Sequence, residues 1–457
     1  MEKIVPVKKN EQLEVEIIDL THEGLGVAKI DGYPLFIENT LPEEIVKIHV
    51  VNIGKKFGYA KVIAWKKKSP HRLENVDTDL MRTGIAPFMH LEYNEQLKFK
   101  KKQVKNVMER IAKMPEAPIM DVIGMENPFA YRNKAQIPVR QIDGKLETGF
   151  YRKNSHMLIP MTEFYIQNPI IDQTIVKVRD ILREVKAKPY NEEQHTGDIR
   201  HIIVRRGHNS HELMIILVTR KGKLFNEKWI IKRITEEVEG LTSLIQNVNP
   251  NRTNVILGEE NKVLFGKPVI QDTLLNNTYE ISPQSFYQVN TQMAEVLYQT
   301  GIEFADLSKD DVVIDAYCGI GTIGQSLANQ VKQVYGVEVV SQAIEDAKKN
   351  AEMNKHHNIT YFTGKAEDVM REWLKAGIQA NVLFVDPARK GLSESFIHAS
   401  VEMRPEKIIY ISCNPATFAR DIQIYHELGY KLEKVQPVDL FPQTAHVETV
   451  ALLTSPY

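Results

Sequence analysis

Cys413 is one of only two cysteines in the chain, and it occupies a position suited to chemistry. It lies in "EKIIYISCNPATFARD" (406–421), after a run of β-branched and aromatic residues that predicts a buried strand. An Asn-Pro pair ends that strand, and a helical pattern follows. A free thiol at the tip of a strand, where the backbone turns, is placed like a nucleophile. Cys318, the other cysteine, is interpreted as a small buried apolar side chain.

Further chemistry-bearing residues follow other predicted strands. From about residue 311, short apolar runs alternate with helical patterns, which is typical of a parallel sheet buried on both faces. Tyr317 ends the first of these strands, Glu338 the second, Asp386 the fourth and Cys413 the fifth. The last two apolar runs predict an antiparallel hairpin at the sheet edge, which brings the total to seven strands. Because doubly wound sheets bind ligands outside the carboxyl ends of their strands, we expect these side chains to share a site.

A glycine-rich turn follows the first of these strands. The segment "CGIGTIG" (318–324) satisfies G-x-G-x-x-G through three glycines: Gly319, Gly321 and Gly324. Such glycines allow a tight turn and close approach to a nucleoside cofactor, and Glu338 can bind its ribose hydroxyls. The pattern fits NAD and S-adenosylmethionine equally. Asp315 before the turn and "DPAR" (386–389) at the fourth strand tip favour S-adenosylmethionine.

A nucleophilic thiol beside a methyl donor suggests methylation of a pyrimidine at carbon 5. That carbon is a poor methyl acceptor until a thiolate adds to carbon 6 and makes carbon 5 enolate-like. A base must then remove the carbon 5 proton so that the cysteine can leave. We assign Glu448, in "AHVETV" (445–450) on the last hairpin, as this base.

The N-terminal part contains segments suited to binding RNA. Residues 13–66 predict five short strands and a small barrel of the OB type, a fold that commonly binds oligonucleotides. Phe57 and Tyr59 offer stacking faces among several lysines. Residues 92–113 predict a basic amphipathic helix, whose lysines are Lys98, Lys100, Lys101, Lys102 and Lys105.

Length and charge indicate several domains with different tasks. A chain of 457 residues predicts an N-terminal OB-like barrel at 8–67, a central α+β region at 68–280 and a doubly wound Rossmann-like α/β domain at 281–457. The last of these carries a net charge of −7 and the remainder carries +6. Basic pairs such as Arg205 and Arg206 occur in the central region. We therefore expect the first two regions to bind an anionic partner and the third to hold the catalytic site.

Composition excludes several classes of protein. No run of 18 apolar residues exists, and the segment at 1–10 lacks the apolar core of a secretory signal. Two cysteines cannot form a disulfide framework, and neither has the spacing of a metal ligand. We expect a cytoplasmic protein with no membrane partner and no bound metal, and no obligate protein partner is evident.

Together these motifs resemble one family, the RNA 5-methyluridine methyltransferases, and within it the 23S rRNA uracil-C5 enzymes of Gram-positive type. The resemblance spans nearly the whole chain, through "YRNKAQIPV", "SFYQVN", "DAYCGIGTIG", "VDPAR", "ISCNPATFARD" and "QPVDLFPQTAHVET". The barrel resembles the RNA-binding TRAM domain, which the tRNA-specific branch generally lacks. The resemblance implies 23S rRNA as the partner, with Cys413 as nucleophile and Glu448 as general base. It also implies four contacts to S-adenosylmethionine: Gln288, Tyr317, Glu338 and Asp386.

Two departures from the family pattern are visible. Many relatives carry a four-cysteine iron–sulfur site that includes "CGGC" just before the helix at 92. Here the segment reads "RTGIAPFMHL" (82–91) and contains no cysteine, so we expect no iron–sulfur cluster. "DPAR" replaces the usual "DPPR" but retains Asp386 and Arg389, whose role stays open.

Four alternatives remain. The first is a tRNA uridine-C5 methyltransferase, against which the barrel counts. The second is a nicotinamide-dependent oxidoreductase, which gives no reason for Cys413 and Glu448. The third is a non-catalytic RNA-binding protein. The fourth, cytosine-5 methylation by two cysteines, lacks a second cysteine in the matching strand-tip context.

Overall fold

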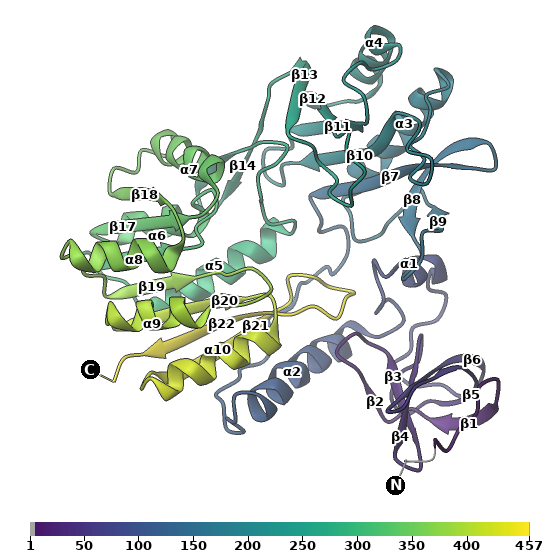
Figure 1. Cartoon of the computed structure of the whole chain (residues 1–457), viewed down its shortest axis with the longest axis horizontal. Coiled ribbons are helices and arrows are strands. Elements are labelled where there is room, and N and C mark those ends of the chain that lie inside the picture. Colours follow the sequence, from purple (N-terminus) through teal and green to yellow (C-terminus); the bar gives the residue numbers. More distant parts are fainter. Residues whose placement is uncertain (1–4, 457) are drawn as a thin grey trace.

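Three large sheets organise the chain, in the order barrel, central region and C-terminal region (Figure 1). The computed structural model describes residues 5–456; residues 1–4, part of the stretch assessed above for a signal, and residue 457 lie outside the described residues. The predicted α/β class and the all-β N-terminal barrel are both confirmed. Within residues 5–456, no helix is long and apolar enough to cross a membrane.

The N-terminal sheet has six strands in the order β1-β5-β6-β4-β3-β2. The strands are β1 (Gln12–Glu16), β2 (Asp19–Leu20), β3 (Gly26–Ile30), β4 (Tyr33–Ile37), β5 (Ile45–Ile53) and β6 (Gly58–Lys67). Alternate side chains such as Leu35, Ile37 and Ile48 are fully buried, as the two-residue period of a strand requires. The structure has six strands where the sequence predicts five, because the chain changes its pairing partner from β5 to β3 between β1 and β2.

A long helix, α2 (Tyr93–Arg110), follows the short α1 (Thr78–Thr83) and leads towards the C-terminal sheet. Its buried side chains are spaced four residues apart and form one stripe: Gln96, Lys100, Val104 and Met108. Lys100, one of the lysines that the sequence assigns to a basic helix suited to RNA, cannot contact RNA, since its ammonium is fully buried against Asp439. Lys102 is used within the chain as well, in an ion pair with Asp19 at 2.8 Å.

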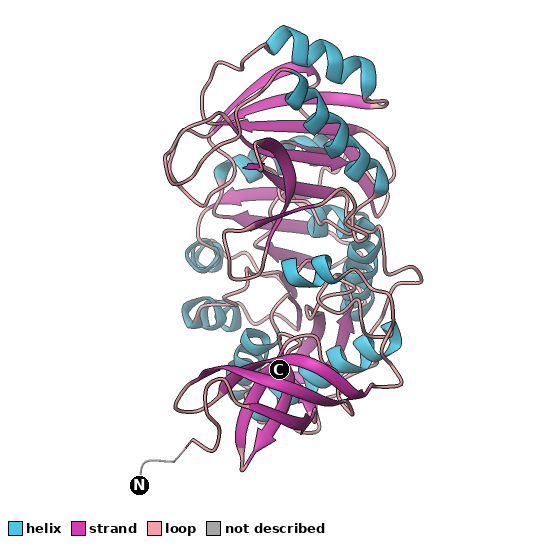
Figure 2. Cartoon of the chain, turned by 90° about the vertical axis from the view of Figure 1, so that its right-hand side faces the viewer, coloured by secondary structure: helices cyan, strands magenta, loops and turns pink. Residues whose placement is uncertain are grey.

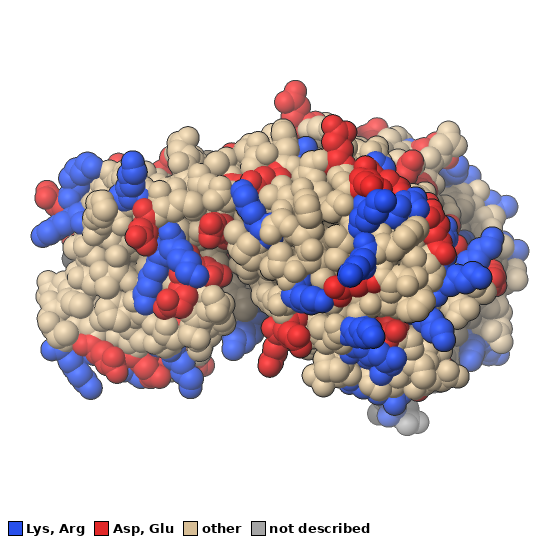
Figure 3. Space-filling view, turned by 90° about the horizontal axis from the view of Figure 1, so that it is seen from above, with Lys and Arg blue, Asp and Glu red and all other residues tan. Residues whose placement is uncertain are grey.

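The central sheet has the order β13-β12-β11-β10-β7-β8-β9 and packs against α3 (Pro169–Glu184) and α4 (Glu227–Glu237). Its strands are β7 (Lys134–Ile142), β8 (Lys145–Tyr151), β9 (Leu158–Pro160), β10 (Ile199–Arg206), β11 (Leu213–Thr219), β12 (Leu241–Val248) and β13 (Glu260–Gly266). Arg205 is buried and donates to the carbonyl oxygens of Ser282 and Ser285, so this member of the predicted basic pair is a structural side chain. Figure 3 shows basic and acidic side chains interspersed over one face of the molecule, which is hollowed between two lobes.

The C-terminal sheet has the order β18-β17-β16-β19-β20-β22-β21. Its strands are β16 (Val312–Ala316), β17 (Gln333–Glu338), β18 (Ile359–Thr363), β19 (Val382–Val385), β20 (Lys407–Ser412), β21 (Lys431–Val438) and β22 (Glu448–Thr454). The first five are parallel, and β22 lies antiparallel between β20 and β21. The helices are α5 (Thr291–Ala305), α6 (Thr322–Leu327), α7 (Ser341–Met353), α8 (Ala366–Lys375), α9 (Glu394–Glu402) and α10 (Pro415–Glu427). They flank both faces (Figure 2), which confirms the predicted doubly wound domain of seven strands.

Two segments outside 281–457 also pack on this domain. The hairpin of β14 (Ile270–Leu274) and β15 (Asn277–Ile281) receives α7, whose Asn350 and Asn354 accept backbone N–H groups of the hairpin at 3.0 and 2.9 Å. The segment at 119–123 forms parallel bridges to β21. The sequence-based division assigned both segments to the central region, because neither carries a local signal of its packing partner.

Candidate active site

A cavity of about 900 Å³ opens at the carboxyl ends of the parallel strands. It is lined by side chains from five separate elements of the C-terminal domain. All six residues singled out in the sequence lie on its wall: Gln288, Tyr317, Glu338, Asp386, Cys413 and Glu448. Six positions spread over 160 residues therefore meet at one edge of one sheet.

The glycine-rich turn between β16 and α6 forms one side of the cavity. Gly319 and Gly321 adopt φ of +54° and +84°, a region that favours glycine. A β-carbon at Gly321 would also collide with the Tyr361 hydroxyl. The N–H of Gly324 donates to the Asp315 carboxylate at 2.8 Å, which ties the turn to its own strand. The turn therefore keeps its backbone open towards the cavity.

Glu338 stands at the tip of β17, next to the turn. One carboxylate oxygen accepts the N–H of Val340 at 3.0 Å, and the other lies 3.4 Å from the N–H of Gly319. These contacts fix the carboxylate where a ligand seated on the turn would present hydroxyl groups.

Cys413 and Glu448 meet because β22 lies directly beside β20. Ser412, the last residue of β20, pairs with Thr449 in antiparallel register, so Cys413 and Glu448 each lie directly next to this final pair. Both side chains line the cavity, with the thiol half-buried and the carboxyl buried.

Asn414 links the two strand-tip loops that carry Asp386 and Cys413. Its amide donates to the carbonyl oxygen of Arg389 at 2.9 Å, and its carbonyl oxygen caps α10 by accepting the N–H of Ala416 at 3.1 Å. The Asn-Pro pair therefore ends a strand, starts a helix and holds the neighbouring loop.

Burial perturbs the acids of the site. It raises the pKa of Asp315 and of Asp386 to about 7. Burial and the charge of Asp386 raise the pKa of Glu448 to about 8, and Arg389 opposes this shift. The pKa of Cys413 is raised to about 11 by burial, Glu448 and Asp386, again against Arg389. A cationic ligand entering this cavity would favour the ionised forms of all four groups.

The sequence-based site residues do not include four aromatic residues of the cavity wall: Phe286, Tyr287, Tyr298 and Phe441. The side chain of Phe286 is 72% exposed at the mouth, and its place beside Gln288 in "SFYQVN" was the available signal. Tyr298 lies in the apolar pattern of α5, which reads as core packing, and its hydroxyl accepts the Gln288 amide at 3.3 Å.

Sequence comparisons identify the family. A family model described as tRNA (Uracil-5-)-methyltransferase matches residues 92–455, and a TRAM domain model matches residues 6–63. The chain belongs to this family of uracil-5 RNA methyltransferases. Two relatives, both called uncharacterized RNA methyltransferases, come from Enterococcus faecalis and Streptococcus mutans. Each is 54% identical to this chain, over 99% and 98% of it respectively and over 99% of each relative. The predicted resemblance to RNA methyltransferases of Gram-positive bacteria is confirmed.

A solved structure shares the architecture of this methyltransferase. It is the Pyrococcus abyssi tRNA (uracil-54, C5)-methyltransferase in complex with S-adenosyl-L-homocysteine, with a TM-score of 0.76 and 24% identity. The match covers 97% of this chain and 100% of that chain, so the shared fold must extend into the barrel at 12–67.

No group of three or more His, Cys, Asp or Glu side chains in the described part of the enzyme is arranged to hold a metal ion. The segment 82–91 instead contributes apolar side chains to the interior, among them Ala86, Phe88 and Leu91.

Proposed function

We propose that this enzyme methylates carbon 5 of uridine in 23S rRNA with S-adenosylmethionine, through a covalent bond between Cys413 and the base. The observation that carries the proposal is that Cys413, directly after β20, and Glu448, at the start of the adjacent β22, line one cavity together with the glycine turn and Glu338. A thiol and a carboxyl in one cavity can act on the two carbons of one pyrimidine double bond.

The first step makes a carbon–sulfur bond. The Cys413 thiol loses its proton to solvent, and the thiolate adds to carbon 6 of the uracil. Because the pKa of Cys413 is about 11, few molecules hold the thiolate at rest. The guanidinium of Arg389 favours the thiolate, which gives this side chain a role in activating the nucleophile.

The last step breaks the carbon–sulfur bond again. Glu448, as a carboxylate, takes the proton from carbon 5, the electron pair restores the double bond between carbons 5 and 6, and the Cys413 thiolate leaves. The pKa of Glu448 is raised to about 8, so its carboxylate is a stronger base than that of an ordinary glutamate. Its burial keeps water away from the proton being moved.

S-adenosylmethionine, when bound, supplies an electrophilic methyl group at carbon 5. The cavity fits it: the turn admits close backbone approach, Glu338 offers a carboxylate for ribose hydroxyls, and the other carboxyls of the wall would favour its positive charge. Its contacts are proposed to be Gln288, Tyr317, Glu338 and Asp386.

The barrel at 8–67 and the central region at 68–280 are proposed to hold the RNA while the domain at 281–457 captures one base. A uracil stacked in a helix hides carbon 6, so the target must be unpaired or flipped out. Phe57 and Tyr59 are each 41% exposed on the barrel, and their rings contact one another and Phe36 with centroids 5.3 to 5.9 Å apart. Such a cluster beside exposed lysines suits unpaired bases.

The covalent step is tested with RNA that contains 5-fluorouridine. Fluorine cannot be removed as a proton, so enzyme incubated with this RNA and S-adenosylmethionine should become bonded to it through Cys413. Glu448→Gln should form the same long-lived bond with ordinary RNA, because its amide cannot accept the proton. Folded, cofactor-loaded enzyme that forms no adduct with 5-fluorouridine RNA would exclude the mechanism.

The choice of 23S rRNA rests on the sequence resemblance, since the barrel does not separate the two RNA classes: the Pyrococcus abyssi tRNA enzyme shares the fold over 97% of this chain. Mapping 5-methyluridine by mass spectrometry in cells with and without the gene decides between them. Loss of the nucleoside from 23S rRNA alone supports the proposal, and loss from tRNA alone favours the alternative. We place the reaction in the cytoplasm, where both cysteines can stay as the free thiols observed here.

A further inference from the structure

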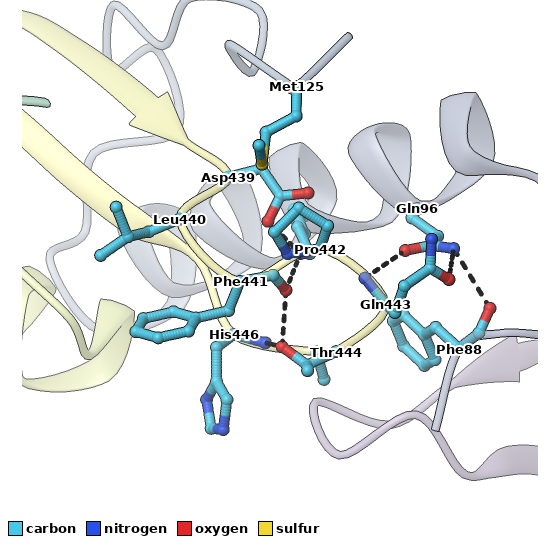
Figure 4. Close-up of polar contacts among 12 residues, drawn as sticks. Phe88, Gln96, Met125, Asp439, Leu440, Phe441, Pro442, Gln443, Thr444 and His446 are labelled. Carbon is cyan, nitrogen blue, oxygen red and sulfur yellow. Dashed lines mark hydrogen bonds and ion pairs between the residues drawn. The ribbon is translucent and has the colours of Figure 1, made fainter. Parts of the chain in front are cut away.

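The loop that leads into Glu448 is held in place by side chains from other parts of the chain. This loop, residues 439–447, joins β21 to β22 and contains no regular secondary structure. Figure 4 shows it beside α2, with Gln443 turned towards Gln96. Because the loop ends at Glu448, its backbone position decides where that carboxyl lies.

Five carbonyl oxygens of the loop are each bound by a donor from outside it. Their residues and donors are Leu440 with Asn290, Phe441 with Lys100, Pro442 with Tyr131, Gln443 with the N–H of Phe88, and Ala445 with Gln103, at 3.0 to 3.2 Å. Irregular loops usually leave such groups to water. Here the donors come from three separate segments, so the loop has one defined backbone position.

Helix α2 supplies the two strongest attachments. Gln96 and Gln443 form a reciprocal pair: the Gln96 amide donates to the Gln443 side-chain oxygen, and the Gln443 N–H donates to the Gln96 side-chain oxygen, both at 3.0 Å. Lys100 donates to the Asp439 carboxylate at 2.5 Å, and neither side chain is exposed. Tyr93 donates to the other oxygen of Asp439 at 2.9 Å.

Two features show that the attachment is specific rather than incidental packing. Gln443 adopts φ of +67°, a conformation that costs a residue with a β-carbon about 1 kcal/mol and that these hydrogen bonds offset. A fully buried ion pair is costly to desolvate and gives little net stability, but it fixes one geometry. Gln96 and Lys100 also continue the stripe of Val104 and Met108, which packs in the core of the catalytic domain.

We propose that Gln96 and Lys100 are positioning residues that set Glu448 for removal of the carbon 5 proton. Neither residue lines the cavity. Both act through the loop at 439–447, where Lys100 holds the backbone carbonyl of Phe441, a residue of the cavity wall. The inference rests on the proposed role of Glu448. Its consequence is that loosening α2 slows release of the base more than attack by the thiol.

The test compares two rates in one preparation of Gln96→Met, which keeps the length of the side chain and removes its hydrogen bonds. The first is formation of the adduct with 5-fluorouridine RNA, which needs Cys413 but no base. The second is turnover of uridine RNA. We expect turnover to fall about ten- to a hundredfold, as for a catalytic group displaced by about 1 Å, while adduct formation changes less than about twofold.

Gln443→Gly provides a second variant. Glycine accepts the positive φ, so the backbone is not strained. The side-chain oxygen that accepts from Gln96 is lost, while the N–H of residue 443 can still donate to Gln96. It should produce the same split between the two rates. Glu109→Gln, at an exposed position on the same helix, is the matched control and should leave both rates unchanged.

The outcomes separate the inference from the function on which it rests. If the native enzyme forms no adduct with 5-fluorouridine RNA, the proposed function fails. If it does, and both folded variants lose the two rates equally or lose neither, the positioning role is excluded. A positioning role also requires that Gln96→Met causes no further slowing of adduct release in the Glu448→Gln background.

Discussion

Glu448→Gln should remove part of the pH dependence of folding stability, because the native structure holds this carboxyl in its neutral form. Its pKa is raised by burial from an ordinary 4.5 to about 8. A carboxyl whose pKa is higher in the folded state than in the unfolded state stabilises the fold. This contribution is fully present below the unfolded-state pKa and is lost as pH rises through the folded-state pKa. Between about pH 5.5 and 7.5 the unfolded chain is ionised at this position while the folded chain is still largely neutral.

The size of the effect follows from the shift. One pKa unit corresponds to about 1.4 kcal/mol, so the native protein should lose about 2.5 kcal/mol of unfolding free energy through Glu448 across this interval. The glutamine amide is neutral at every pH and matches the protonated acid in shape. Asp315 titrates in both proteins, so its contribution cancels in the comparison, and Asp386 contributes a difference only through its repulsion of the ionised Glu448.

Denaturant unfolding at about pH 5.5 and pH 7.5 measures the difference for both proteins. The unfolding free energy of Glu448→Gln relative to that of the native protein should be about 2.5 kcal/mol greater at the higher pH than at the lower pH. Glu372→Gln, at an exposed position on α8, is the control and should show a constant gap. If native protein and Glu448→Gln lose stability in parallel, Glu448 is already ionised in the fold and the electrostatic description of the site is wrong.

Three further outcomes are expected. Cys413→Ser should bind RNA and S-adenosylmethionine but form neither adduct nor product, because a serine hydroxyl is far too weak an acid to add to carbon 6; methylation by this variant would assign the nucleophile elsewhere. Protein purified without oxygen should be colourless and should keep its activity in chelators, and stoichiometric iron with acid-labile sulfide would contradict this. Phe57→Ala and Tyr59→Ala should each weaken binding of unpaired RNA by about 1–3 kcal/mol with little change in salt dependence, whereas unchanged affinity would remove the barrel face from the RNA site.

The sequence predicts the catalytic fold well because its signals are local. Continuous apolar runs indicate strands buried on both faces. Polar residues that follow these runs lie at one edge of the sheet, because the carboxyl ends of parallel strands meet there. The proximity of Cys413 and Glu448 is different. The sequence predicts the final hairpin but not that its second strand inserts between β20 and β21, which is what brings Glu448 next to the end of β20 and to Cys413. Strand order is decided by packing across the whole domain.

The basic character of α2 shows a second limit. Lys100 and Lys102 look alike in the sequence, since both are lysines on a helix with a 3.6-residue pattern. One is buried against Asp439, 339 positions away, and the other pairs with Asp19 on the barrel. The spacing of apolar residues shows which side of a helix is buried, but not what packs against that side. A charged residue that the sequence suggests for RNA binding can therefore lie in the interior.

These contacts also change what removal of the barrel would mean. A β-carbon at Gly24 would collide with the Phe88 ring, and Gln103 donates to the carbonyl oxygens of both His22 on the barrel and Ala445 on the catalytic loop. Deleting residues 1–67 would therefore uncover Phe88 and free one end of the support for the loop at 439–447. Activity lost on truncation would combine weaker RNA binding with a displaced Glu448. Substitutions on the exposed barrel face leave these contacts intact. Only such substitutions separate the role of the barrel in binding RNA from its role in supporting the loop that positions Glu448.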